Sequence, residues 1–392
     1  VMLEANKRHP GALIVGERKN LENVERSKGS KFANSFSNFW FAVQTGQYLK
    51  DTQTGYRLYP LKKLRGLSLL TSRYEAELEL MVFASWHGVK LVSEPVNVYY
   101  PPREERVSHF RPGKDFARIT VLNAVLCFLA VVYGLPITIF RGLMTLLRTI
   151  YAIVFFIFTT LCMMTPLVHI YLLFGKITEE KKYNLHRILN FMAKFVLRYH
   201  KIPGVRYTES NNSGEDFTKP AVIICNHQSH LDLAPMLALT PKIIVLTADW
   251  VWKNPVYRFT IRNAEFLPAS SGMDAIMPQL KSPVERGYSI AVYPEGTRSL
   301  DCSLGRFRQG ACHVAQTLGI DILPVVIYGT GKALKKRGRL LRKWPVHMEI
   351  DRRITPEEMK SMGETTRHQA SQMRKYYQKR YTEIADRIEQ DV

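Results

Sequence analysis

Two long runs without a charged residue constrain this chain more than any other feature. The first run covers residues 119–140 and the second covers residues 149–175. Each is long enough to cross the hydrocarbon layer of a membrane as a helix, which takes roughly 20 residues. Only the short segment 141–148 separates them, so the sequence predicts a two-helix transmembrane hairpin over residues 118–175. A pair of buried core helices is the alternative.

Positive charge around the two runs predicts the orientation of the hairpin. Basic residues are frequent before the first run and after the second, whereas the segment between the runs holds two arginines. The positive-inside rule then places both polar regions in the cytoplasm, in an integral membrane protein. The flanking basic residues are Arg103, Arg106, Arg111, Lys114 and Arg118 before the runs, and Lys176, Lys181, Lys182 and Arg187 after them.

The chain as a whole is strongly basic. It has 55 Lys and Arg residues against 34 Asp and Glu residues, a net charge of +21, which attracts polyanions such as nucleic acid or anionic lipid headgroups. The predicted membrane helices favour lipid, so we expect membrane lipids and an anionic membrane surface as partners and no nucleic acid. The basic run 332–343 fits the same partner, and a solvated basic surface is the alternative.

Residues 176–204 predict an amphipathic helix followed by a linker. Apolar residues recur at helical spacing between positions 185 and 196. Such a helix can lie on the membrane surface or pack against the next domain, and the sequence leaves both open.

From residue 205 to residue 392, apolar strands alternate with helical segments. Residues 221–225, 243–246, 289–293 and 322–327 are continuous apolar runs of strand length. Continuous apolar strands between helices are typical of an α/β fold with a mostly parallel sheet and helices on both faces.

The first motif that carries chemistry follows the apolar run 221–225. It reads Asn226-His227-Gln228-Ser229-His230-Leu231-Asp232. On a regular helix this spacing would place His227 and Asp232 roughly 140° apart, so they can meet only if His227 precedes the helix. Asp232 could then hold one imidazole nitrogen as N–H and leave the other free to remove a proton from a hydroxyl group. We predict His227 and Asp232 as the catalytic residues.

The second motif follows the apolar run 289–293 and reads Pro294-Glu295-Gly296-Thr297-Arg298. An arginine beside a glycine at a strand end is typical of a site for a phosphate or a carboxylate, because the planar guanidinium group binds either one through two hydrogen bonds. Arg298 is therefore a candidate for binding an anionic substrate group.

In this order and spacing, the two motifs resemble those of the 1-acylglycerol-3-phosphate acyltransferase family, from Val205 onward. The resemblance implies that His227 is the general base and that Asp232 orients it. It implies transfer of a fatty acyl group from acyl-CoA or acyl carrier protein to a hydroxyl of a lysophospholipid or glycolipid, without a cofactor. By the same resemblance, the substrate site contains Glu295, Gly296, Thr297, Arg298 and Pro324.

One block departs from that family. Where the family has an aromatic-Ile-Asp-Arg run, with an arginine for the acceptor phosphate, this chain reads Glu265-Phe266-Leu267-Pro268-Ala269-Ser270. Arg262 is the candidate that would compensate, and a different hydroxylated lipid is an equally consistent acceptor.

The same residues allow other kinds of chemistry. His227, His230 and Asp232 could bind a metal, but no further His or Cys lies close downstream, so no metal site is predicted. Cys225 and Ser229 lack the G-x-S-x-G pattern of a nucleophile, and the five cysteines have no C-x-x-C spacing. Residues 329–332 lack the full phosphate-loop pattern and are predicted as a turn.

Residues 1–117 are polar, with short strand-like runs, and predict a separate α/β region. The segments 51–60, 73–77 and 94–96 resemble the later part of family-2 glycosyltransferases of the polyprenyl-phosphate sugar transferase type. The resemblance implies that Asp51 and Arg57 lie on the acceptor side of a sugar-transfer site. We expect a fragment that transfers sugar, with a divalent metal, only when the missing nucleotide-sugar half is present.

Two rival functions remain. Sugar transfer could be the main activity, with the acyltransferase region as an accessory, or the chain could be a non-catalytic membrane-binding module that keeps the motifs. Acyl transfer is the preferred prediction, because His227, Asp232, Glu295 and Arg298 are all present.

Overall fold

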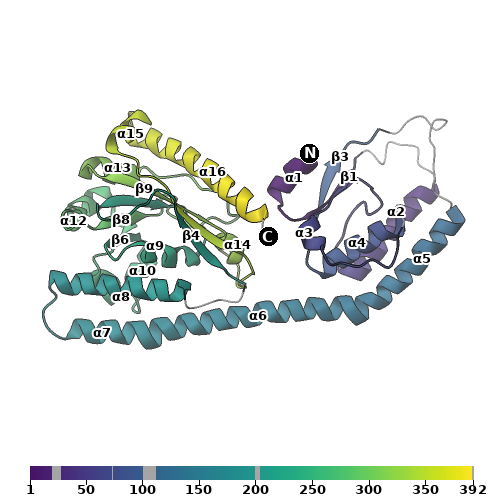
Figure 1. Cartoon of the computed structure of the whole chain (residues 1–392), viewed down its shortest axis with the longest axis horizontal. Helices are drawn as coiled ribbons and strands as arrows, with labels where there is room; N and C mark the ends of the chain where they lie inside the picture. Colours follow the sequence, from purple (N-terminus) through teal and green to yellow (C-terminus); the bar gives the residue numbers. More distant parts are fainter. Residues whose placement is uncertain (20–27, 73, 100–111, 199–203, 391–392) are drawn as a thin grey trace. The chain divides into compact units, whose positions relative to one another are not determined.

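The structure is a computed structural model that describes residues 1–19, 28–72, 74–99, 112–198 and 204–390 (Figure 1). The chain folds into two compact units. The first is Val1–Met144 with a short C-terminal segment, and the second is Thr145–Ile388. The glycosyltransferase-like segments 51–60 and 94–96 lie in the first unit, and both acyltransferase-like motifs lie in the second; residue 73 of the segment 73–77 is outside the described residues.

The first unit is a small α/β arrangement. Strand β1 (Leu13–Arg18) pairs in parallel with β3 (Leu91–Val96) and antiparallel with β2 (Arg57–Leu58). Its core joins Leu13 of β1 to Phe41, Met81 and Trp86 of the helices. Besides the start of the long helix described below, the helices of this unit are α1 (Met2–Arg8), α2 (Lys28–Thr45), α3 (Leu61–Leu64) and α4 (Tyr74–Trp86).

The two uncharged runs form one continuous helical segment, and the predicted hairpin turn is wrong. Residues 141–148, where the turn was expected, lie inside α6 (Leu135–Ile157). Within residues 141–148, Gly142 has the lowest helix propensity, and most of the other residues are Leu, Met or Arg, which propagate a helix well. The other parts of the continuous helical segment are α5 (Pro112–Leu129), the π-helical turns Ala130–Gly134 and Phe158–Met164, and α7 (Thr165–Leu173).

Both π-helical turns end just before a proline, Pro136 or Pro166. A proline inside a helix lacks the N–H group and crowds the carbonyl of the preceding turn, and a locally wider turn accommodates both effects. At the second site the Thr165 hydroxyl donates to the Thr160 carbonyl at 2.7 Å. The helix therefore passes through both prolines instead of ending there.

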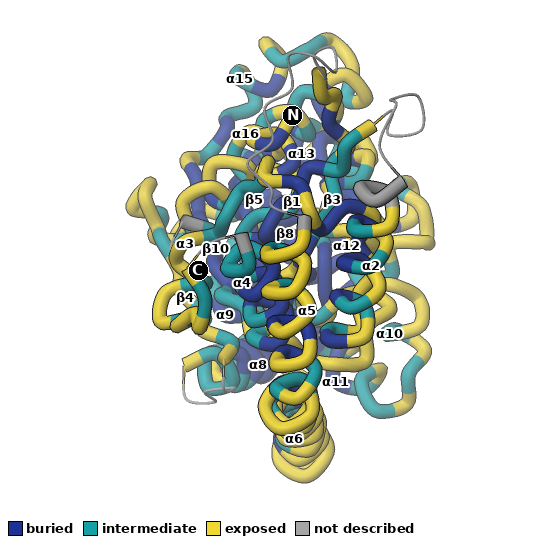
Figure 2. Tube along the Cα trace, turned by 90° about the vertical axis from the view of Figure 1, so that its right-hand side faces the viewer, coloured by how far each residue is buried: buried dark blue, intermediate teal, exposed yellow. Residues whose placement is uncertain are grey.

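Each part of this long helix packs one face and exposes another. In the first unit, Leu122 and Leu126 are buried, and Gly134 lies so close to Trp86 that an added Cβ would be 2.5 Å from the indole ring. In the second unit, Val168 and Leu172 of α7 join the core. The middle is largely exposed, as Figure 2 shows for α6. Among the described residues, Gly113–Leu173 is the one helix long and apolar enough to cross a membrane.

The second unit is built on a sheet with the order β4-β10-β9-β5-β8-β6-β7. β9 and β10 are antiparallel, and all other neighbours are parallel, which confirms the predicted α/β fold with a mostly parallel sheet. Helices cover both faces (Figure 1). The strands are β4 (Tyr207–Asn211), β5 (Ala221–Cys225), β6 (Ile243–Thr247), β7 (Leu267–Pro268), β8 (Ser289–Val292), β9 (Asp321–Tyr328) and β10 (Val346–Ile350). The helices are α8 (Glu179–Arg198), α9 (Leu233–Leu239), α10 (Asp249–Lys253), α11 (Arg258–Asn263), α12 (Met273–Glu285), α13 (Gly310–Leu318), α14 (Thr330–Ala333), α15 (Pro356–Ser361) and α16 (Thr366–Gln390).

Helix α8 is the amphipathic helix predicted within residues 176–204. Its apolar side chains Leu185 and Leu189 belong to the core of the second unit, and Asn190 Nδ2 donates to the Leu237 carbonyl at 2.7 Å. The apolar face is thus used for packing on the domain, while Phe191 on another face is 63% exposed.

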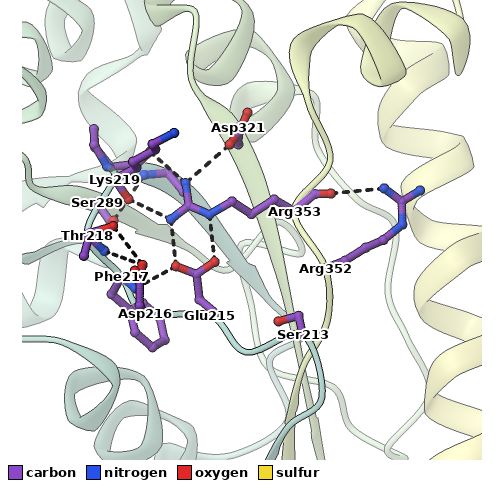
Figure 3. Close-up of polar contacts among 12 residues, drawn as sticks. Ser213, Glu215, Asp216, Phe217, Thr218, Lys219, Ser289, Asp321, Arg352 and Arg353 are labelled. Carbon is purple, nitrogen blue, oxygen red and sulfur yellow. Dashed lines mark hydrogen bonds and ion pairs between the residues drawn. The ribbon is translucent and has the colours of Figure 1, made fainter.

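Arg353, which follows β10 in the sequence, links the loop before β5 to the start of β9. Arg353 Nε and Nη2 donate to the two carboxylate oxygens of Glu215 at 2.7 and 2.8 Å (Figure 3). Its Nη1 lies 3.3 Å from Asp321 Oδ2, and Nη2 also donates to the Lys219 carbonyl at 2.8 Å. Since β5 and β9 are central neighbours, this cluster helps to hold the register of the strands that carry the site.

Replacing Arg353 by glutamine tests this ion cluster. We expect the free energy of unfolding to fall by roughly 1–3 kcal/mol, because Glu215 would lose its bidentate partner in a half-buried position. The hydrogen bond with Arg353 is the main cause that lowers the pKa of Glu215. The contribution is therefore present above the ordinary pKa of glutamate and is lost as the pH falls through the lowered value.

Thermal unfolding measured from acid to neutral pH checks this expectation. Arg352→Gln is the matched control, because the Arg352 side chain is 71% exposed and pairs with Glu358 at the surface. Equal unfolding temperatures for the two variants at neutral pH would contradict the assignment.

Candidate active site

The first motif lies where β5 ends, at the carboxyl edge of the parallel strands. His227 is in the loop after the strand, and Asp232 closes the short 3₁₀ turn His230–Asp232. Ser229 is the N-cap residue of this turn, and the Asp232 carboxylate accepts from the backbone N–H of Ser229. Together these hydrogen bonds form a capping box that fixes the local backbone. The loop brings the two predicted catalytic residues together: His227 Nδ1 lies 2.8 Å from Asp232 Oδ2.

The hydrogen bonds of Asp232 define the tautomer of His227. Asp232 is fully buried, and its Oδ2 also accepts from the backbone N–H groups of Gln228 and Ser229 at 2.7 and 2.8 Å. An ionised carboxylate can only accept, so Nδ1 of His227 carries the proton. Nε2 is then the free base, and the His227 side chain is 23% exposed, which leaves it open to a substrate hydroxyl.

The ring of Tyr293 packs against one face of the His227 imidazole. The two rings are stacked, with centroids 4.2 Å apart and planes inclined by 25°. The Tyr293 hydroxyl donates to the Asp232 backbone carbonyl at 3.1 Å, and burial raises the pKa of this phenol, which keeps it a donor. The last residue of the apolar run 289–293 therefore fixes the plane of the base, a role that the sequence motif did not reveal.

Glu295 joins the two motifs through the backbone. Its Oε1 accepts from the His227 N–H and its Oε2 accepts from the Gly305 N–H, both at 3.0 Å. Burial raises the pKa of Glu295, and these two N–H donors oppose that rise. Both carboxylate oxygens are turned toward the protein, so this predicted substrate-binding residue serves in the structure as a brace for the catalytic loop.

The remaining residues of the second motif form an exposed basic loop end. Gly296 has a φ of +66°, which favours glycine, and a Cβ there would lie 2.9 Å from the Arg308 guanidinium carbon. Lys336 Nζ donates to Thr297 Oγ1 at 2.9 Å and to the Arg298 carbonyl at 2.8 Å. The side chain of Arg298 is half-buried.

The Ser299 N–H donates to the His227 carbonyl at 2.9 Å, so the backbone next to Arg298 adjoins the first motif. Burial is the main cause that lowers the pKa of His230, and the positive charge of Arg298 lowers it further. The two motifs thus meet at one edge of the sheet, with a cation beside the histidine-bearing loop.

The other residues predicted for the substrate site lie farther from this pair. Pro324 is buried in β9 and pairs in register with Ile224 of β5. Arg262 is exposed, with its guanidinium 5.1 Å from the ring centre of Trp252. Within the described residues, no hydrogen bond or ion pair joins Arg262 to His227 or Arg298.

The residues predicted from the glycosyltransferase resemblance are engaged in contacts inside the first unit. Asp51 accepts from Arg18 Nε and Nη2 at 2.5 and 2.7 Å. Arg57 Nη2 donates to the Thr52 carbonyl at 2.8 Å, and Nη1 donates to the Glu77 carbonyl at 2.9 Å. Both predicted side chains are almost fully buried.

Alternative chemistry finds little support in the surroundings of the same loop. Burial raises the pKa of Cys225 well above its ordinary value, so this group stays a thiol. The Ser229 hydroxyl donates to the Leu334 carbonyl at 2.9 Å. Residues 329–332, predicted as a turn, lie instead at the start of the short helix α14, with Gly329, whose φ is +91°, as the N-cap residue. The described residues contain no group of three His, Cys, Asp or Glu side chains placed to hold a metal ion.

Helix α16 supports the site and was missed as a functional element. Tyr381 OH donates to Gln228 Oε1 at 3.2 Å, and Gln228 Nε2 donates to the Cys302 carbonyl at 2.9 Å. Arg374 donates to the carbonyls of Leu304 and Gly305 at 3.1 and 2.8 Å. The only signal in the sequence is an apolar stripe at helical spacing, whose buried members are Ala370, Met373, Tyr377 and Ile384.

Comparison with known proteins agrees with this geometry. Residues 204–328 match the family model described as Acyltransferase. Over these residues the chain is therefore similar to enzymes of the acyltransferase class, the class that the two motifs predicted.

The same region is similar to named 1-acyl-sn-glycerol-3-phosphate acyltransferases. The Arabidopsis thaliana chloroplastic enzyme LPAT1 is 31% identical over 120 residues, which cover 29% of this chain and 33% of that protein. The human enzyme named beta is 26% identical over 144 residues, which cover 35% of this chain and 52% of that protein. The chain thus spans about a third to a half of the length of these relatives.

A solved structure shares the fold. The crystal structure of the 1-acyl-sn-glycerophosphate acyltransferase PlsC from Thermotoga maritima covers 63% of this chain and 97% of its own, with 19% identity and a TM-score of 0.50. At this identity the likeness concerns the fold alone.

We expect Arg374→Gln to lower kcat of acyl transfer by about 10-fold or more with a smaller change in KM. The reason is that Arg374 holds the carbonyls next to the Gly305 N–H, which in turn binds Glu295 and so the His227 backbone. Steady-state kinetics with the full chain measures both constants.

The neighbouring exposed residue supplies the control, Lys375→Gln, which should retain normal kinetics. Arg374→Lys should recover part of kcat, since the ammonium can donate to one carbonyl. A uniform loss of folded protein with unchanged kcat per folded molecule would show that Arg374 stabilises the fold only.

Proposed function

We propose that this chain transfers a fatty acyl group from acyl-CoA or acyl carrier protein to a hydroxyl of a lysophospholipid. The observation that carries the proposal is the contact of His227 Nδ1 with the buried Asp232 carboxylate, which leaves Nε2 as a free base at an accessible edge of the sheet. The names of the similar proteins support the acceptor class.

The proposed reaction is a direct transfer with one proton carried by His227. Nε2 removes the proton of the acceptor hydroxyl as its oxygen attacks the thioester carbonyl carbon. Asp232 stabilises the imidazolium ion that forms, because it already accepts the Nδ1–H. The C–S bond then breaks, the thiolate takes the proton from Nε2, and the ester and the free thiol leave.

Arg298 is proposed to bind the phosphate of the acceptor. It is half-buried beside the histidine-bearing loop, and Lys336 Nζ donates to the Thr297 hydroxyl and to the Arg298 carbonyl of the second motif. The proposal does not depend on Arg262, which stacks on Trp252. A glycolipid or another hydroxylated lipid is the alternative acceptor, because the block 265–270 lacks the family's arginine.

Membrane association is proposed through the exposed apolar side chains of the long helix. Large apolar residues are exposed throughout α6, while α7 packs one face on the core of the second unit. A helix that keeps one face on its domain and offers the other to hydrocarbon is suited to contact lipid along its length. The cytoplasmic surface is the proposed side, because the basic residues that flank the helix favour the anionic lipids of that leaflet.

A second candidate function concerns the first unit. We propose that it derives from a family-2 glycosyltransferase, on the basis of the segments around Asp51 and Arg57 and of the parallel pair β1–β3. Assays of sugar transfer from nucleotide sugars to polyprenyl phosphate, with a divalent metal, would test whether sugar transfer is the main activity.

His227→Ala should lower the rate of acyl transfer by at least about 10³-fold, because the variant loses the base that its contact with Asp232 holds in place. The measurement is transfer of a labelled acyl group from acyl-CoA or acyl carrier protein to a mixture of lysolipids, with mass spectrometry of the products. The matched control is His368→Ala, which removes an exposed imidazole of α16 and should leave the rate unchanged. Undiminished transfer by His227→Ala would sink the proposed mechanism, and absence of transfer by the unmodified chain would favour the non-catalytic alternative.

A further inference from the structure

A surface loop of unusual charge follows α14. We call residues 335–343 the basic loop; it contains no acidic residue. Its exposed cations are Lys335, Arg337, Arg339, Arg342 and Lys343. In the same loop Leu340 is 46% exposed, whereas Leu341 is buried in the core of the second unit.

The basic loop is fastened to α6. The backbone N–H of Leu341 donates to Thr149 Oγ1 at 2.9 Å, and both residues are buried at this contact. On either side of Thr149 the helix exposes Leu146, Leu147 and Ile150, each to nearly half of its surface. A strip of cations therefore adjoins a strip of exposed apolar side chains.

The other end of the basic loop is fastened to the candidate active site. Lys336 binds Thr297 and the carbonyl of Arg298, and the carbonyl of the preceding Leu334 accepts from Ser229. The charge of the loop also reaches the neighbouring segment, because Lys335, together with Lys332 of α14, lowers the pKa of Cys302 against the larger effect of burial. One loop thus connects α6 with both catalytic motifs.

We propose that the basic loop is the contact of this protein with anionic lipid headgroups. Cations beside an apolar helix face match the charged and the hydrocarbon layers of a membrane that contains acidic lipids. Nucleic acid would match the charge but would leave Leu340 and the apolar face of α6 in water. This contact would hold the edge of the sheet that carries His227 against the lipid surface. The inference rests on the proposed membrane association, and it does not require acyl transfer.

Hydrogen exchange followed by mass spectrometry tests the proposal on the full chain in lipid nanodiscs. One set of nanodiscs contains phosphatidylcholine alone, and the other contains about 30 mol % phosphatidylglycerol in addition. We expect backbone exchange in residues 335–343 to be at least about 3-fold slower in the anionic nanodiscs. The acidic, exposed loop 211–218 serves as an internal reference whose exchange should not change.

Two pairs of charge reversals sharpen the test. Arg337→Glu with Arg339→Glu should remove the difference between the two lipids. Lys360→Glu with Arg367→Glu makes the same change in net charge at exposed positions of α15 and α16 and should preserve the difference. His227→Ala should also preserve it, which separates lipid contact from catalysis.

The proposal is overturned if residues 335–343 exchange equally in both lipids, or if the Arg337 and Arg339 reversal leaves the protection intact. Protection by added RNA without protection by anionic lipid would overturn it in favour of a nucleic-acid contact.

Discussion

The site depends on one buried carboxylate oxygen. Oδ2 of Asp232 accepts from His227 and from the backbone N–H groups of Gln228 and Ser229, while Oδ1 has no hydrogen-bond partner among the described residues. A buried charge of this kind is tolerated only when donors are fixed around it. The strand end, the capping box and the histidine tautomer are therefore one arrangement, and loss of any one part would leave the buried carboxylate with fewer donors.

The sequence predicted this arrangement well because its determinants are local. Apolar runs end directly at titratable residues, and the spacing of His227 and Asp232 requires a non-helical entry to the turn, which the structure has. The supports around it are different. Tyr293, Glu295 and Arg374 act through backbone groups that are distant in sequence, and no motif marks which N–H or carbonyl a side chain will find. Sequence patterns therefore predict the reactive residues at strand ends, but they do not predict the hydrogen bonds and ring contacts that fix those residues in place.

The long helix shows the opposite case. Hydropathy correctly marks residues 119–140 and most of residues 149–175 as helical, but it does not say whether the helix bends between them. The turn was inferred from two arginines, and arginine is a good helix former. The sequence also did not predict that Leu122 packs in the core of the first unit and Val168 in the core of the second. When every face of a helix is apolar, the residues that pack on protein cannot be told from those that would contact lipid.

Helix α16 lies beyond residue 328, where the likeness to the acyltransferase family model ends, yet Arg374, Tyr377 and Tyr381 reach back to the loops and strands of the matched region. The stretch that matches the family model and the stretch that supports the site are thus partly different. A graft of residues 204–328 into another protein would carry both catalytic motifs but would lack α16, which supports them. A backbone carbonyl accepts from any donor that reaches it, so the support that α16 gives depends on where its side chains end and not on which residue types supply the donors.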